Sequence, residues 1–181
     1  MSSTFKLSLI AFTTSLLFAG CTSVPPQNEN KKTVKVNAVS SSGIGAEIGY
    51  IQLQDSPAGL VLLTNLTNLP AGPHGFHIHE KGSCEPAEKD GKMGAALAAG
   101  SHFNPLKVQN HGTPLSGHMG DLPLLNVSQD GTAKVSLIAP RLKISDIEGL
   151  AIMVHAGGDN YSDDPKPLGG GGDRIACGVI K

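Results

Sequence analysis

The chain contains seven histidines, and all of them lie between His74 and His155. Two of them belong to the motif His77-Ile78-His79, in which a single residue separates the imidazoles. On a β-strand, residues two apart share a face and their side chains lie about 6.5–7 Å apart, so two imidazoles at this spacing can converge on one metal ion. For this motif alone, two surface histidines on a strand are the commoner alternative.

A second group of metal-binding side chains follows within twenty residues. It consists of His102, His111, His118 and Asp121. Three imidazole nitrogens and one carboxylate oxygen form a tetrahedral set of the kind that suits Zn²⁺. A polar loop that happens to be rich in histidine is the alternative interpretation.

The third group begins with His155, at the end of an apolar run, and continues with Asp159. Four glycines at residues 169–172 then precede Asp173 and Arg174. A glycine run can bind phosphate, but no Lys-Ser or Lys-Thr follows this one and no G-x-G-x-x-G opens a helix. We therefore exclude nucleotide binding and expect the glycines to let the backbone pass close to another group.

The segments that must position these side chains alternate with a period of two. Val34 and Val36, for example, flank the polar Lys35. Apolar runs at residues 59–66, 150–154 and 175–180 suit strands that are buried on one or both faces. No long stretch has the spacing of an amphipathic helix, which favours an all-β sandwich or barrel.

Two long irregular segments interrupt the strand pattern, at about residues 81–122 and 156–174. Loops of this length in a compact domain are usually functional, and the first of these contains three of the seven histidines. The tripeptide Gln129-Asp130-Gly131 lies between two strand-like runs and predicts a hairpin.

Composition limits the classes of function. With 181 residues, 39% of them hydrophobic, the chain suits one domain with a proper core. Its 14 basic and 15 acidic residues give a net charge of −1, and they form no basic stripe. We therefore expect no nucleic-acid partner.

The first residues form an export signal rather than part of the fold. Lys6 precedes an apolar run at residues 7–19, which is shorter than the roughly 20 residues of a membrane-spanning helix and is typical of a secretory signal peptide. The small residues directly before Cys21 resemble the cleavage site of bacterial lipoproteins. We expect removal of residues 1–20 and acylation of Cys21, with residues 21–32 as a tether and residues 33–181 as the domain. Ordinary cleavage nearby, leaving Cys21 as a free thiol, is the alternative.

This signal predicts a periplasmic protein that is anchored in the membrane by lipid. Thr22, rather than Asp, follows the cysteine, which favours the outer membrane. In that oxidising compartment the remaining Cys84 and Cys177 form a disulfide. Two free buried thiols are the alternative.

Five motifs occur in a fixed order along the chain: GFHIHE, HFNP, GHMGDLP, MVHAGGDN and GGGGDRIACGVI. Together they resemble the copper–zinc superoxide dismutases of the bacterial periplasm, over about residues 33–181. The resemblance implies a Greek-key β-sandwich or flattened barrel of about eight antiparallel strands with two long functional loops. It implies one copper and one zinc ion per subunit, and dismutation of superoxide to oxygen and hydrogen peroxide by one-electron cycling of the copper, which protects the cell envelope. It leaves both a monomer and a homodimer open.

Carried over position by position, the resemblance assigns six of the seven histidines to metals. The copper ligands are His77, His79, His102 and His155. The zinc ligands are His102, which bridges both metals, together with His111, His118 and Asp121. The seventh histidine, His74, matches a position that is not a ligand, and we expect it to be a hydrogen-bonded structural residue.

The resemblance also assigns roles around the metals. Asp159 matches a carboxylate that joins His77 to His111, and Arg174 matches the arginine that holds superoxide beside the copper. His102 and Arg174 are therefore the predicted catalytic residues. Lys81, Lys89 and Lys92 are candidates for steering the anion toward the site, and ordinary solubilising lysines are the alternative.

Two other functions compete with dismutation. The first is a non-enzymatic copper- or zinc-binding lipoprotein, which would have no use for Arg174 beside an open metal position. The second is a zinc hydrolase, which needs an open zinc position that four protein ligands do not leave.

Overall fold

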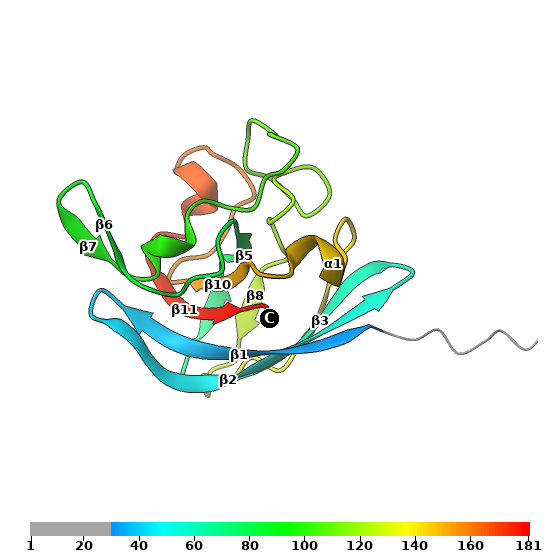
Figure 1. Cartoon of the computed structure of the whole chain (residues 1–181), viewed down its shortest axis with the longest axis horizontal. Helices are drawn as coiled ribbons and strands as arrows, with labels where there is room; N and C mark the ends of the chain where they lie inside the picture. The colour runs from blue at the N-terminus through cyan, green and yellow to red at the C-terminus, as the bar shows by residue number, and fades with distance from the viewer. Residues whose placement is uncertain (1–29) are drawn as a thin grey trace, which may run out of the picture.

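The computed structural model describes residues 30–181 (Figure 1). The predicted signal peptide, Cys21 and most of the predicted tether lie outside these residues. Regular structure in the described part is almost entirely antiparallel β, which confirms the all-β prediction. Of its three short helical segments, one is the α-helix α1 (Ile144–Ile147) and two are 3-10 turns, η1 (Leu97–Ala99) and η2 (Pro167–Gly170). No helix among the described residues is long and apolar enough to cross a membrane.

The main sheet has seven strands, in the order β5-β10-β11-β1-β2-β3-β9. Their bounds are β1 (Lys31–Ser40), β2 (Gly43–Ser56), β3 (Gly59–Leu66), β5 (Phe76–His79), β9 (Ser136–Ala139), β10 (Ala151–His155) and β11 (Arg174–Val179). Two small ladders complete the fold: β4 (Gly72–His74) pairs with β8 (Leu125–Val127), and β6 (Ala87–Lys89) pairs with β7 (Lys92–Gly94). The strands curl into a half-barrel (Figure 1).

The inner face of the half-barrel encloses an aliphatic core. Val34 and Val36 of β1 are buried and Lys35 between them is exposed, as the alternation predicts. On β2 and β3, Ile51, Leu53 and Leu62 are fully buried. Phe76 is the one aromatic side chain among the largest fully buried residues of the described chain, which reflects the aromatic-poor composition.

Two local predictions differ from the structure. β1 begins at Lys31 rather than at residue 33, because Lys31 pairs with Gln54 at the end of β2. The turn at residues 129–131 forms, with Gly131 at φ 79° and its N–H donating to the Ser128 carbonyl. The predicted hairpin is wrong, however, since β8 pairs with β4 and β9 pairs with β3. A turn signal specifies where the chain reverses but not which strands then pair.

Residues 30–181 contain eleven strands where about eight were expected. One extra strand arises because β4 and β5 are separated at Gly75, whose N–H donates to the Gly157 carbonyl and whose own carbonyl accepts from the His155 N–H. The other two are β6 and β7, a hairpin inside the first long loop. Counting β4 and β5 as one strand and setting that hairpin aside leaves eight of the eleven.

The two long connections were correctly predicted and occupy residues 80–124 and 156–173. In Figure 1 they lie on the side of β5 and β10 that faces away from β1 and β2. Three hydrogen bonds join them: the Leu124 N–H donates to the Tyr161 hydroxyl, the His111 N–H donates to Asp163, and the His111 ring donates to Asp159. These loops cover the histidines that the strands present.

Candidate metal centre

Strands β5 and β10 place the first histidines. In β5, Phe76 and Ile78 are fully buried in the core, so His77 and His79 project together from the opposite face. Their ring centroids are 6.5 Å apart, which is the spacing expected for alternate residues of a strand. The loops bury this face as well, since His77 and His79 are 0% and 1% exposed. His155 is contributed by the end of the neighbouring β10.

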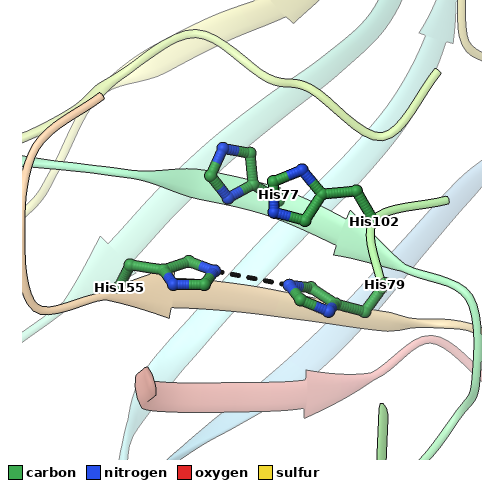
Figure 2. Close-up of side chains that lie close together, drawn as sticks. All are labelled: His77, His79, His102 and His155. Carbon is green, nitrogen blue, oxygen red and sulfur yellow. Dashed lines mark hydrogen bonds between the residues drawn. The ribbon is translucent and has the colours of Figure 1, made fainter. Parts of the chain in front are cut away.

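Four imidazoles form the first ligand set: His77, His79, His102 and His155 (Figure 2). One nitrogen of each lies within 4.8 Å of the corresponding nitrogens of the others. The Nε2 atoms of His79 and His155 are only 3.3 Å apart. The four rings come from two adjacent strands and from the loop after β5.

The second nitrogen of two of these rings defines which tautomer is present. His79 Nδ1 faces the Gly100 carbonyl at 3.0 Å, and His155 Nδ1 faces the Gly172 carbonyl at 3.1 Å. A carbonyl oxygen only accepts, so both Nδ1 atoms donate and both Nε2 atoms carry lone pairs. Two lone pairs that face each other at 3.3 Å suit a shared cation between them.

Burial keeps these rings neutral, as metal ligands must be. Desolvation is the largest effect on each, and it lowers the pKa of His155 to about 3 and that of His77 to about 4. Desolvation, reinforced by the charge of Arg174, also holds the pKa of His79 well below its ordinary value.

Asp121 organises the second ligand set. Its Oδ2 accepts backbone N–H bonds from Gly112 at 3.0 Å and His118 at 2.8 Å. Its Oδ1 faces three imidazole Nδ1 atoms, those of His102 at 3.0 Å, His111 at 3.1 Å and His118 at 3.5 Å. Ligands at 2.0–2.1 Å from a tetrahedral zinc ion are about 3.3 Å apart, so these separations fit Zn²⁺.

His102 is common to both sets, as a bridging ligand must be. The tighter grouping on the Asp121 side contains His77, His102, His111 and Asp121, within 4.8 Å of one another, and His118 lies at its margin. The rings of His77 and His102 are stacked with their centroids 3.9 Å apart. The buried Nδ1 atoms of His77, His111 and His118 have no hydrogen-bond partner among the described residues. Unsatisfied buried nitrogens are rare, and here they point toward the space between the ligands.

Asp159 connects the two sets through the ring nitrogens that face away from them. It accepts from His77 Nε2 at 2.8 Å on one oxygen, and from His111 Nε2 at 2.8 Å and the Tyr161 N–H at 2.7 Å on the other. These bonds leave the Nδ1 atoms of both rings facing the ligand sets. A Cβ on Gly169, at φ 71°, would collide with Asp159 Oδ1, which confirms that the glycine run permits a close approach.

The carboxylates also affect the charge of the second set. Burial opposes ionisation of Asp121 and Asp159, but hydrogen bonds from the histidines outweigh it and hold the pKa of both carboxyl groups well below its ordinary value. Burial would lower the pKa of His111, but the Asp121 carboxylate, 3.1 Å from Nδ1, and the Asp159 carboxylate, which is hydrogen-bonded to Nε2, overcome this effect and raise the pKa to about 9.

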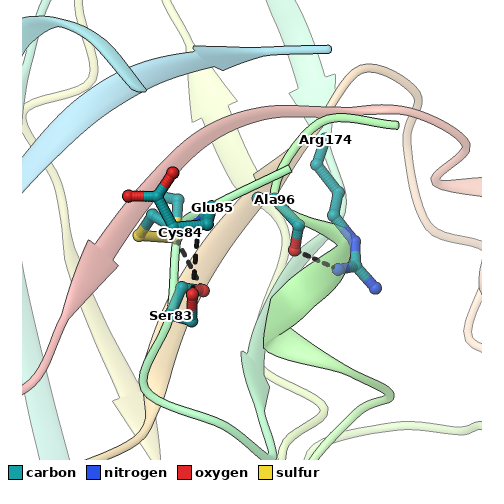
Figure 3. The surroundings of a disulfide bond; sticks show 6 residues. Ser83, Cys84, Glu85, Ala96 and Arg174 are labelled. Atoms are coloured by element: carbon teal, nitrogen blue, oxygen red, sulfur yellow. Dashed lines mark hydrogen bonds between the residues drawn. A yellow bond between two sulfur atoms is a disulfide. The ribbon is translucent and has the colours of Figure 1, made fainter. Parts of the chain in front are cut away.

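Arg174 lies at the start of β11, where the first long loop holds its guanidinium (Figure 3). Nη1 donates to the Ala96 carbonyl at 2.5 Å, and Nη2 donates to the Gly100 carbonyl at 2.6 Å. The Gly100 carbonyl also accepts from His79 Nδ1, so one oxygen aligns the arginine and a ligand ring.

The disulfide between Cys84 and Cys177 ties the same loop to β11, with a Cα–Cα distance of 5.7 Å. The predicted pairing is therefore confirmed, and the alternative of two free thiols is wrong. The bond lies three residues beyond Arg174 in the strand.

A cavity of about 390 Å³ opens over the first ligand set. Its lining includes His79, His102, His155 and Arg174. Glu88 and Lys89, from the hairpin β6–β7, also line it. Of the three candidate steering lysines, Lys89 lines this cavity, whereas Lys81 and Lys92 are exposed and do not.

Two further residues bond backbone carbonyls close to the ligand sets. His74 lies outside both ligand sets, with Nδ1 2.7 Å from the His155 carbonyl and Nε2 2.8 Å from the Pro70 carbonyl. Arg141, which the sequence analysis missed, donates to three carbonyls of the segment before Asp121. No local pattern marks it, because it is a single arginine in a turn after β9.

The fold is a half-barrel of antiparallel strands, and its loops bury two overlapping sets of metal ligands. These two features define an all-β metalloprotein with a two-metal site. The profile of the family described as copper/zinc superoxide dismutase (SODC) matches residues 47–180. The chain therefore belongs to the copper/zinc superoxide dismutase family, as its motifs predicted.

Individual relatives support this membership. The superoxide dismutase [Cu-Zn] of Escherichia coli K12 is 54% identical over 150 residues, covering 82% of this chain and 87% of that protein. Superoxide dismutase [Cu-Zn] 1 of Salmonella typhimurium LT2 is 50% identical, covering 92% of this chain and 96% of that protein. The solved structure of the Cu/Zn superoxide dismutase from Brucella abortus superposes with a TM-score of 0.82 at 48% identity, covering 84% of this chain and 100% of that one.

Proposed function

We propose that this enzyme converts two superoxide anions and two protons into oxygen and hydrogen peroxide at a copper ion held by the first ligand set. That set is His77, His79, His102 and His155. Zinc belongs to the second set, His102, His111, His118 and Asp121. The observation that carries the proposal is the pair of overlapping sets that share His102, with ring lone pairs turned toward each set. When bound, copper supplies one-electron exchange, which zinc lacks.

Arg174 binds the substrate in this proposal. Superoxide is a small anion, and the guanidinium has five N–H donors of which two are used by the Ala96 and Gly100 carbonyls. Arg174 lines the same cavity as His79, His102 and His155, and three of its donors are left for the anion. A rigidly held cation at this place orients the anion through charge-assisted hydrogen bonds.

His102 handles protons. One of its nitrogens lies on the Asp121 side, where Asp121 Oδ1 is 3.0 Å from Nδ1 and keeps the ring in position. The other nitrogen belongs to the set that lines the cavity. Nε2 is therefore the atom at which a proton is held and passed to the reduced substrate.

Steering of the anion depends on local charge, because the net charge of −1 does not attract it. Lys89 is placed to do this at the cavity. Lys81 and Lys92 lie away from the cavity lining and contribute only through the wider field, which salt screens.

The cellular location follows from the N-terminal sequence. We propose cleavage before Cys21, acylation of that cysteine and a periplasmic domain tethered to the outer membrane. A disulfide in the domain suits an oxidising compartment. Cys21→Ser should release the protein from isolated membranes, and unchanged membrane partitioning would remove this part of the proposal.

The test of the activity is superoxide dismutation by the metal-reconstituted protein with His102→Ala and Arg174→Ala alongside. We expect His102→Ala to abolish most activity and Arg174→Ala to reduce it at low substrate concentration. Lys166→Ala, an exposed cation on the second long loop, is the matched control for loss of charge. Activity that neither substitution changes would exclude the mechanism and favour a non-enzymatic copper- and zinc-binding protein.

A further inference from the structure

His118 differs from the other five ligand histidines in how its ring is held. Each of the other rings has a hydrogen-bonding partner: Asp159 for His77 and His111, Gly100 for His79, Asp121 for His102 and Gly172 for His155. The ring of His118 has none among the described residues. Its side chain is 10% exposed and lines a separate cavity of about 680 Å³. Backbone contacts must therefore fix this ring.

The backbone of His118 is held on both sides. Its N–H donates to Asp121 Oδ2 at 2.8 Å, and its carbonyl accepts from Arg141 Nη2 at 2.7 Å. The same Nη2 donates to the Gly117 carbonyl at 2.9 Å, and Nε donates to the Pro114 carbonyl at 2.6 Å. One planar guanidinium thus binds three carbonyls within five consecutive residues.

Arg141 is itself anchored to the main sheet. It lies in the turn directly after β9, which is closed by a hydrogen bond from the Leu142 N–H to the Ala139 carbonyl. Ala139 and Leu142, on either side of it, are 2% and 1% exposed and belong to the core. The arginine therefore holds a loop segment, 23 to 27 residues away in the sequence, in a fixed position relative to the main sheet.

We infer that Arg141 is a positioning residue for zinc: it fixes the backbone at residues 114–118 so that His118 Nδ1 stays beside Asp121. This inference rests on the proposed zinc site. The hydrogen bonds of the guanidinium go to the carbonyls of Pro114, Gly117 and His118. It therefore holds His118 through the backbone, whereas a partner outside the ligand sets holds His77, His79, His111 and His155 by a hydrogen bond to the ring.

The test measures zinc and copper affinity separately, by transfer of each metal from the loaded protein to a competing chelator. Arg141→Met should lower zinc affinity by about 10- to 100-fold, the usual effect of losing a partner behind a ligand, and leave copper affinity unchanged. Lys143→Met is the matched control, because it removes a cation two residues away whose side chain bonds only the Ser56 carbonyl. The visible absorption of Co²⁺ in the zinc position should weaken in Arg141→Met and not in the control.

Two further variants separate positioning from general support of the fold. In a His118→Ala background, Arg141→Met should cause no additional loss of zinc affinity, because Arg141 affects zinc binding only by holding His118 in place. Arg141→Lys should give an intermediate zinc affinity, because a compact ammonium cannot replace a planar fork that binds three carbonyls. If Arg141→Met does not fold, Arg141→Lys is tested in both backgrounds instead.

Three results would overturn the inference: unchanged zinc affinity, equal losses of zinc and copper affinity, or an undiminished loss in the His118→Ala background. Failure of the proposed function is a different result. In that case the wild-type protein binds no stoichiometric zinc, or His118→Ala binds it as tightly as wild type, and the inference falls with the site.

Discussion

Asp159 is hydrogen-bonded to one histidine of each ligand set, so a substitution there should change the affinity for both metals, but by different amounts. Its carboxylate accepts three N–H bonds, two of them on Oδ1, from His111 and Tyr161, and one on Oδ2, from His77. Asp159→Asn keeps the shape but converts one oxygen into an amide NH₂ group, which donates. Two donors at Oδ1 outweigh one at Oδ2, so the amide should keep its oxygen on the His111 side and turn its NH₂ group toward His77.

The magnitude follows from what His77 then loses. A hydrogen bond to a charged group contributes about 1.5–3 kcal/mol. To accept from the new amide, His77 must in addition move its proton to Nδ1, the buried nitrogen that now faces the first ligand set. Since 1.4 kcal/mol corresponds to a factor of ten, copper affinity should fall by about 10- to 100-fold. Zinc affinity should fall less, because His111 keeps its oxygen partner.

Competition titrations of Cu²⁺ and Zn²⁺ against chelators of known affinity measure both effects. Asp164→Asn removes the same charge from an exposed carboxylate in the same loop, and should leave both affinities near wild type. The reasoning is refuted if zinc affinity falls as much as copper affinity, or if Asp164→Asn reproduces the effect of Asp159→Asn.

Three other outcomes are expected. Replacing both Cys84 and Cys177 by Ala opens a cross-link with a sequence separation of 93, so the free energy of unfolding in urea should fall by about 4–5 kcal/mol, and a loss below about 1 kcal/mol would contradict the chain-entropy argument. Because the pKa of His111 is raised to about 9, the metal-free protein holds an extra proton on this ring at pH 7.5. Zinc binding must displace that proton, so zinc affinity should rise with pH up to about 9. Zinc titration in weak buffer should therefore release about one proton per zinc ion bound. A pH-independent zinc affinity would show that His111 is already neutral. Lys89→Met should lower kcat/KM by several-fold at low ionic strength and flatten its dependence on salt, while Lys92→Met, an exposed control on the same hairpin, should change both less.

The strands were the more predictable part of the fold. The apolar run at residues 59–66 coincides with β3, and the alternation around Lys35 places Val34 and Val36 in the core. The pairing of β8 and β9 with different partners was not predictable, because the choice of partner depends on burial of side chains from distant strands. The hairpin β6–β7 was missed for a similar reason, since its three-residue strands have almost no buried side chain and no alternating pattern.

The sequence by itself determined the residue types of the site and their family. Five of the six ligand histidines and Asp121 stand in four recognisable motifs, His111 lies between two of these motifs, and the disulfide pairing followed from the export signal. Only the tertiary structure decided which ring nitrogen faces each ligand set. The tautomer of His79 depends on the Gly100 carbonyl and that of His155 on the Gly172 carbonyl.

The same holds for Arg141, whose three carbonyl partners lie 23 to 27 residues away. Such contacts have no local signature, because a hydrogen bond forms wherever packing of the whole chain brings a donor and an acceptor together. The identity of a ligand depends on its side chain and can be read from the sequence, whereas the orientation of a ligand depends on the packing of the whole fold.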